Sequence, residues 1–349
     1  MIPLKHIQLF SKYFSAFDRH LIRSMETAWP ETETAITRNF WAMLNGDEEW
    51  KIDGIDGNPT EWLVSKLSHD GFDFSFSLRP HAGLEAEITF ADFGIHFVYE
   101  DKITKNTSES CYIVQAKSLY RNPRRAKFNI NDKFVAACDT QRLGLHWLGK
   151  IIGGNAVKYM AYCPRLSAYE TSSQQAIRAL HAPNIGSIYV GNQFGLALTA
   201  ELRKGANCSS DGVWLSPASQ HLHTAGGLHK EAFDATLPFG WFVISNLYTL
   251  SGYNFSDSRR IIYPWYKIFP ASQLYTKKLE KKFDLAKGLA LCDDGAIDDI
   301  CSISKVEKPK SFFRPAATLT IRVSRSPQME LDLEPRPDAD GDDFDDPSL

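Results

Sequence analysis

The chain has 349 residues, of which 43% are hydrophobic and 12% aromatic, a composition typical of a packed globular protein rather than a disordered one. No apolar run reaches the ~18–20 residues that span a bilayer. The N-terminal residues show no signal-peptide core, and the six cysteines form no C-x-x-C pair. We therefore expect a cytoplasmic protein with no membrane association, disulfide scaffold or zinc ribbon.

The formal net charge of −3 hides an uneven distribution. Residues 327–349 hold nine acidic residues and one basic residue, Arg336, so this segment carries −8 and the rest of the chain, by difference, +5. Four prolines and few apolar residues predict that this tail is disordered. Its simplest role is solubility; the alternative is that it competes with nucleic acid for a basic groove or docks on a partner. The mildly basic remainder is compatible with nucleic-acid binding.

Helical periodicity marks the N-terminal part of the chain. Apolar residues recur at helical spacing over residues 4–28, which predicts a helix ended by a Trp-Pro pair. A second helix is expected to open at Glu31 or Thr32 and to end at Asn45-Gly46. Residues 58–68 are expected to form a third, short helix.

Three strands are predicted next. Apolar and polar residues alternate with period two over residues 72–78, and the segments 88–99 and 111–119 are rich in aromatic and β-branched residues. We expect these segments to form a three-stranded meander. The polar interval 101–110 is expected to be an exposed, mobile excursion.

A helix over residues 129–150 and a strand over 157–163 follow. The order α-β-β-β-α-β predicts an α/β fold with a mixed sheet flanked by helices. Residues 166–326 are expected either to complete this core with further α/β elements or to form a second lobe. Within them, segments 187–191 and 212–215 look like strands, and segments 230–248 and 273–289 look like helices.

Asp92, Gln115 and Lys117 carry the strongest chemical signal. Residues two apart on a strand share a face, so Gln115 and Lys117 project together. An antiparallel partner strand that begins at Asp92 can bring its carboxylate alongside them. Mg²⁺ or Mn²⁺ prefers such oxygen ligands and needs only one or two carboxylates. Because Lys117 could orient a water or neutralise developing charge, the set predicts metal-dependent phosphodiester cleavage.

The chain has Asp92 and, about two dozen residues later, Gln115-Ala-Lys117. This pattern resembles the PD-(D/E)XK superfamily of restriction-endonuclease-like nucleases. More narrowly, it resembles bacterial defence-associated members with Gln-x-Lys in place of Glu-x-Lys. Glu33 resembles the helix-borne acidic residue that such proteins often place near the metal, and the run from Glu85 into Asp92 resembles theirs. The resemblance covers roughly residues 20–165. It implies a restriction-endonuclease-like core and a role in prokaryotic defence against foreign DNA, gated by a partner or a signal.

The neutral Gln115 departs from the Asp/Glu-x-Lys pattern and gives the site one fewer negative charge. Metal affinity is then lower, unless Glu33 or Glu87 supplies the missing carboxylate. Each residue also has a structural interpretation. Asp92 could cap a turn, the Gln-x-Lys pair could face solvent on an edge strand, and Glu33 could simply complement a helix dipole.

Two basic clusters are candidates for nucleic-acid contact. The first directly follows the strand that carries the lysine, and we expect it to hold the substrate backbone: Arg121, Arg124, Arg125 and Lys127. The second runs from Arg259 to Lys282 among aromatic residues, and a solvated helix face explains it slightly better.

The sequence therefore predicts a nuclease core over residues 1–165, an accessory region over 166–326 and an acidic tail over 327–349. The expected activity is metal-dependent endonuclease cleavage, with DNA as the expected substrate and Mg²⁺ or Mn²⁺ as cofactor. A protein partner from a defence system and self-association both stay open. The alternative functions are a non-catalytic nucleic-acid-binding or sensor subunit and a structural interaction protein.

Overall fold

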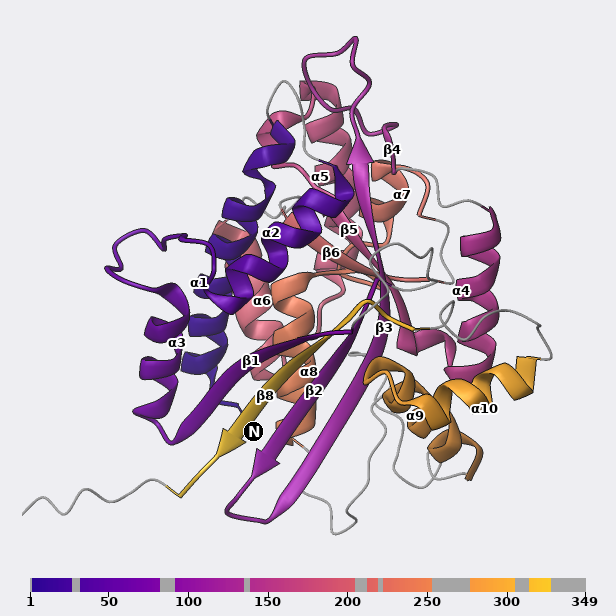
Figure 1. The fold of residues 1–349 in the computed structure, drawn as a ribbon. Helices are drawn as coiled ribbons and strands as arrows, with labels where there is room; N and C mark the ends of the chain where they lie inside the picture. The colour runs from indigo at the N-terminus through magenta and orange to yellow at the C-terminus, as the bar shows by residue number, and fades with distance from the viewer. Residues whose placement is uncertain are drawn as a thin grey trace, which may run out of the picture.

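Figure 1 shows a computed structural model of the chain, which describes residues 2–26, 32–81, 92–134, 139–204, 212–218, 222–252, 277–304 and 314–327. One sheet of eight strands runs through these residues, and helices cover both of its faces. This is an α/β fold with a mixed, mostly antiparallel sheet, as the order of elements predicted. None of the helices in the described part of the chain is both long and apolar enough to cross a membrane.

Among the described residues, three α-helices precede the first strand, and all three were predicted. They are α1 (Leu4–Leu21, continued by a 3-10 helix over Ile22–Glu26), α2 (Glu33–Asn45) and α3 (Pro59–Ser68). The caps of α2 explain its bounds. The Thr32 side chain accepts a hydrogen bond from the Ala35 N–H (3.3 Å), and Gly46 adopts the left-handed conformation (φ 79°) that ends the helix.

The strands of the sheet pair in the order β1-β8-β2-β3-β5-β6-β7, and β4 pairs with β3 on the side. Strand β8 runs parallel to β2, and β3 parallel to β5, whereas the other neighbours are antiparallel. The strands are β1 (Phe72–Pro80), β2 (Phe93–Asp101), β3 (Asn106–Tyr120), β4 (Lys133–Phe134), β5 (Val157–Cys163), β6 (Gly212–Pro217), β7 (Leu237–Pro238) and β8 (Ala317–Arg325).

The predicted meander of the first three strands is wrong, because β8 lies between β1 and β2. All nine residues of β8 pair with β1 on one side and with β2 on the other. Its apolar residues Leu319, Ile321 and Val323 are buried, which suits a strand that has a neighbour on each side. The domain boundary at residue 165 stays a prediction, although strands from both sides of it share this one sheet.

The segment 101–110, predicted to be an exposed, mobile excursion, is exposed in part, but it is the end of the β2–β3 hairpin rather than a separate loop. Strands β2 and β3 stay paired to the end of a tight hairpin, where Asp101 lies opposite Asn106. The Asp101 side chain accepts hydrogen bonds from the N–H groups of Ile103 (3.0 Å) and Thr104 (3.2 Å), which stabilises the turn. Some polar residues of this segment have partners from distant elements: the Ser110 hydroxyl donates to the Asn246 side chain (2.9 Å), and Glu109 pairs with Lys287.

Three further expectations need correction. The helix predicted over 129–150 is α4 (Asp139–Ile152), because Asn129 starts a turn in which its N–H donates to Asp132 (2.7 Å). Residues 187–191 form no strand but connect two helices. The segment 230–248 is not one helix: α7 ends at Lys230, turns and β7 follow, and α8 begins at Phe239. The remaining helices are α5 (Thr171–Gly186), α6 (Gln193–Lys204), α7 (Ala225–Lys230), α8 (Phe239–Gly252), α9 (Lys277–Ala290) and α10 (Asp294–Ser304).

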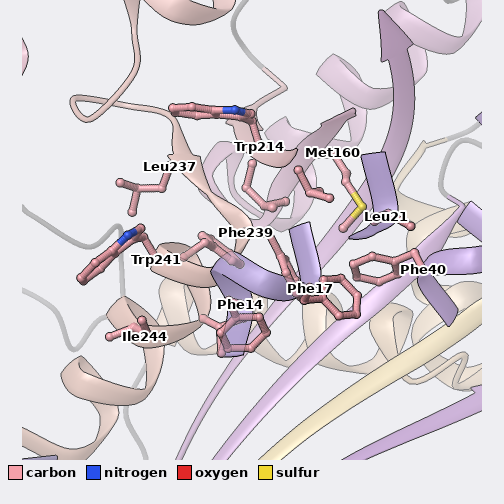
Figure 2. Packing of buried hydrophobic residues seen from close by; sticks show 14 of the residues in the cluster. Phe14, Phe17, Leu21, Phe40, Met160, Trp214, Leu237, Phe239, Trp241 and Ile244 are labelled. Carbon is pink, nitrogen blue, oxygen red and sulfur yellow. The ribbon is translucent and has the colours of Figure 1, made fainter. Parts of the chain in front are cut away.

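An aromatic cluster fixes α2 against the sheet. Figure 2 shows Phe17, Phe40 and Phe239 packed together, from α1, α2 and α8. The ring centroids lie 5.4 Å apart for Phe17 and Phe40, and 5.1 Å apart for Phe40 and Phe239, both edge to face. Helix α2 carries Glu33 at its first residue, so this cluster also determines where that carboxylate lies.

Helix α9 covers the opposite face of the sheet, with α4 and α10 beside it (Figure 1). A Cβ atom on Gly94 of β2 would lie only 2.3 Å from the carbonyl oxygen of Ala290. Glycine at this position therefore allows α9 to pack directly onto β2, two residues after Asp92. The predicted acidic tail, from residue 328 onward, lies outside the described residues.

Candidate active site

Asp92 is held between two strands. Its N–H donates to the carbonyl of Val114 (2.9 Å) in β3, and its carbonyl accepts from the N–H of Ala316 (3.0 Å), just before β8. The Asp92 Oδ2 atom accepts two short hydrogen bonds, from the Gln115 Nε2 and from the Ala116 N–H, both at 2.6 Å. The structure thus places the Asp92 carboxylate directly against the Gln115 side chain, as an antiparallel pairing of β2 and β3 requires.

Lys117 and Glu33 form the second half of the site. The Lys117 side chain is only 9% exposed, and its Nζ lies 3.5 Å from the Glu33 Oε1. The other Glu33 oxygen, Oε2, accepts a hydrogen bond from the Ser118 N–H (3.1 Å). Glu33 therefore reaches from the first turn of α2 to the backbone of β3, and all four predicted site residues come together.

Both carboxylates lie in surroundings that disfavour their charge. Burial raises the pKa of Asp92, and the Ala116 N–H, the Lys117 charge and Gln115 oppose this only in part. Burial also raises the pKa of Glu33; Lys117 lowers it, and the charge of Asp92 raises it further. Since the charge of Asp92 acts on Glu33, a cation near both would stabilise the ionised forms that the protein alone disfavours.

The donor atoms available for such a cation are two carboxylates and one amide oxygen, from Asp92, Glu33 and Gln115. These hard oxygen ligands suit Mg²⁺ or Mn²⁺, which completes its coordination with water. In the described part of the chain, no group of three or more His, Cys, Asp or Glu side chains is placed to hold a metal ion. The residues fit a divalent ion with several water ligands, and they do not form a closed protein cage.

Sequence reasoning missed Tyr162 and Thr37, which border the site. Their hydroxyl oxygens lie 2.9 Å apart, and burial raises the pKa of Tyr162, while the charges of Asp92 and Glu33 raise it further. Tyr162 lies opposite Ser118 in the parallel pairing of β3 with β5. That register is the signal that could have revealed Tyr162, but it links residues far apart in the sequence.

The first basic cluster divides into two pairs. Arg125 donates to the buried Asp132 (2.8 Å), and Arg121 donates to the Ala126 carbonyl (3.0 Å) and lies over the Phe128 ring. These two arginines stabilise the loop that follows β3. The side chains of Arg124 and Lys127 are exposed, and no described residue forms an ion pair with either of them.

Several other predicted residues cannot be placed. Glu85 and Glu87 lie outside the described residues, as does the start of the second basic cluster at Arg259. That cluster continues into α9, where Lys281 and Lys282 lie.

Comparisons of the chain with protein-family models, with curated proteins and with solved structures give no match. An α/β sheet of this kind is compatible with many activities. A function therefore has to be inferred from the residues of the site itself.

Proposed function

We propose that the chain is a metal-dependent nuclease with a restriction-endonuclease-like core, which hydrolyses phosphodiester bonds of DNA in prokaryotic defence. The observation that carries the proposal is one small cluster. Gln115 contacts Asp92 at 2.6 Å, and two residues further along β3 Lys117 lies 3.5 Å from Glu33. Carboxylates, an oxygen ligand and a buried lysine are the groups that phosphodiester hydrolysis with a metal requires.

In this proposal Asp92, Glu33 and Gln115 hold Mg²⁺ or Mn²⁺. When bound, the ion supplies positive charge for the phosphoryl oxygens and lowers the pKa of a bound water. Lys117 orients the attacking water or neutralises the developing charge, and its burial strengthens that effect because screening by solvent is weak. Glu33 also fixes the position of the lysine ammonium group. The mixed sheet with the β2–β3 hairpin near its centre supports a core of this family.

The exposed Arg124 and Lys127 are the residues proposed to contact substrate phosphates, whereas Arg121 and Arg125 shape the loop. Arg124→Gln should weaken DNA binding and reduce its salt dependence, because one phosphate contact is lost. Arg125→Gln should chiefly lower the stability of the loop, because the buried Asp132 carboxylate loses its cationic partner. Titrations of labelled DNA at several salt concentrations, with thermal unfolding of each variant, separate the two roles. Equal effects on DNA binding would contradict this division.

The activity is tested by cleavage of plasmid, single-stranded DNA and RNA, with Mg²⁺, with Mn²⁺ and with chelator. Wild-type protein is compared with Asp92→Ala and Lys117→Ala, and with Lys66→Ala, an exposed lysine on α3, as the control. The proposal predicts metal-dependent cleavage by the wild type and the control, and its loss in both site variants. Cleavage that persists in both site variants would contradict the site.

A second candidate is a non-catalytic nucleic-acid-binding or sensor subunit. The neutral Gln115 favours it, since its amide nitrogen faces Asp92 where a Glu-x-Lys site has a carboxylate. Nucleic-acid affinity without cleavage, and without any dependence on metal, would support this candidate against the nuclease.

A further inference from the structure

A groove of about 440 Å³ lies between α1 and α6, and no residue of the candidate active site lines it. Four polar residues of α1 form a stripe along it, because Gln8, Lys12, Ser15 and Arg19 recur at helical spacing. The volume falls within the range of small-molecule sites and far exceeds that of a single inorganic anion.

The charge of the groove is positive. Lys12 and Arg19 from α1 and Lys204 from α6 line it, together with one acidic residue, Glu201, which pairs with Lys204 at 2.9 Å. Lys12 lies over the Trp62 ring, with its Nζ 5.6 Å from the ring centroid. Arg19 is exposed, and no carboxylate among the described residues pairs with it. An anion bound at Arg19 would therefore give this side chain a partner without displacing an ion pair that Arg19 already makes.

Ser11 gives a second, independent indication of a ligand. It lines the groove and is only 6% exposed, yet its hydroxyl has no hydrogen-bond partner among the described residues. A buried hydroxyl without a partner is costly, and native proteins rarely keep one unless water or a ligand satisfies it. A ligand that offers an acceptor oxygen inside the groove would satisfy it.

The remaining wall of the groove is apolar. Ile7, Ala197 and Trp241 line it, and Figure 2 shows the Trp241 indole extending away from Phe239 and Phe17. Phe194 of α6 packs edge to face against this indole, with the ring centroids 5.6 Å apart. A ligand that fills the groove therefore needs an anionic group with several acceptor oxygens and a flat apolar part.

We propose that this groove binds a nucleoside phosphate. The phosphate contacts the cations of α1 and α6 and accepts a hydrogen bond from the Ser11 hydroxyl, and the base lies against the apolar wall. The site is separate from the candidate active site, so the proposal stands whether or not the chain is a nuclease.

The test is isothermal titration of the full chain with ADP, in the presence of EDTA so that no metal at Asp92 contributes. Pyrophosphate and adenosine are titrated separately, because pyrophosphate carries only the phosphate groups of ADP and adenosine carries only its nucleoside. We expect saturable binding of one ADP per chain, at least about tenfold weaker binding of either half, and unchanged ADP binding by Asp92→Asn.

Two substitutions with matched readouts complete the test. Arg19→Gln should weaken ADP binding about tenfold, whereas Arg23→Gln, an exposed arginine just beyond the groove, should not change it. Ser11→Ala should weaken binding similarly without lowering the thermal midpoint, because the variant loses only a hydroxyl without a partner.

The proposal is overturned if no probe shows saturable binding. It is also overturned if Arg19→Gln and Arg23→Gln weaken ADP binding equally, which would indicate diffuse surface charge. Pyrophosphate that binds as tightly as ADP would exclude the nucleoside part of the ligand.

Discussion

Gln115→Glu restores the acidic residue of the Glu-x-Lys pattern and is the most informative single change at the site. In the wild type the Gln115 amide nitrogen donates to the Asp92 Oδ2 at 2.6 Å. The substitution replaces this donor with a second carboxylate at the same place. Without metal the two acidic groups repel each other; with metal the variant offers one more negative ligand. The sign of the effect on stability should therefore depend on the metal.

The separation of the two groups sets the size of the effect. Two full charges 2.6 Å apart repel each other by about 6 kcal/mol at an effective dielectric constant of ~20. The variant can avoid this repulsion if the new carboxyl is protonated in the folded protein. A Glu in the unfolded chain has a pKa of about 4.3, so keeping this group protonated costs about 1.4 kcal/mol for each pH unit above that value. The loss of stability is thus limited to about 5 kcal/mol at pH 8 and about 1 kcal/mol at pH 5.

Urea unfolding of the wild type and of Gln115→Glu between pH 5 and pH 8 measures this difference. Gln193→Glu, at the exposed start of α6, adds the same charge away from the site and should change stability by less than about 0.5 kcal/mol. At pH 8, Mn²⁺ should stabilise Gln115→Glu more than the wild type, and at 100 times its dissociation constant an ion adds about 2.7 kcal/mol. Equal stability of Gln115→Glu and wild type at pH 8 without metal would refute the contact between Gln115 and Asp92.

Two further predictions concern the surroundings of the site. Burial raises the pKa of Glu33, so the stability that this group contributes is complete below the pKa of the unfolded chain and is lost as the pH rises through the raised folded value. Glu33→Gln should remove that part of the pH dependence in urea unfolding from pH 4 to 8, and an unchanged slope would contradict the burial of the carboxylate. Gly94→Ala should cost about 1–3 kcal/mol of stability, because the new Cβ meets the Ala290 carbonyl at 2.3 Å. Gly154→Ala is the control, because a Cβ atom at that position would have no neighbour within 4 Å. Equal melting temperatures for the two variants would exclude the close packing of α9 on β2.

Local signals in the sequence were sufficient for the elements that build the site. Thr32 and Gly46 mark the ends of α2, and the alternation of residues in β3 places Gln115 and Lys117 on one face. Because β2 and β3 are consecutive and antiparallel, the approach of Asp92 to Gln115 also follows from neighbouring segments.

Long-range pairing left no comparable signal. The insertion of β8 between β1 and β2 joins segments more than 200 residues apart in the sequence (Asp101 and Ala317), and nothing in residues 72–101 indicates it. The polar stretch 101–110 looked like a loop because its partners lie far away in the sequence: Asn246 accepts from Ser110, and Lys287 pairs with Glu109. Polar residues in a strand are read correctly only when the element that satisfies them is known.

A titration of the metal-free full chain with Mn²⁺ tests the proposed metal site most directly. The wild type should bind one ion, Asp92→Asn should bind it at least about tenfold more weakly, and Lys117→Ala should still bind it, because the lysine is not a ligand. The absence of a saturable site in the wild type, or binding that Asp92→Asn leaves unchanged, would contradict a metal centre at Asp92, Gln115 and Glu33.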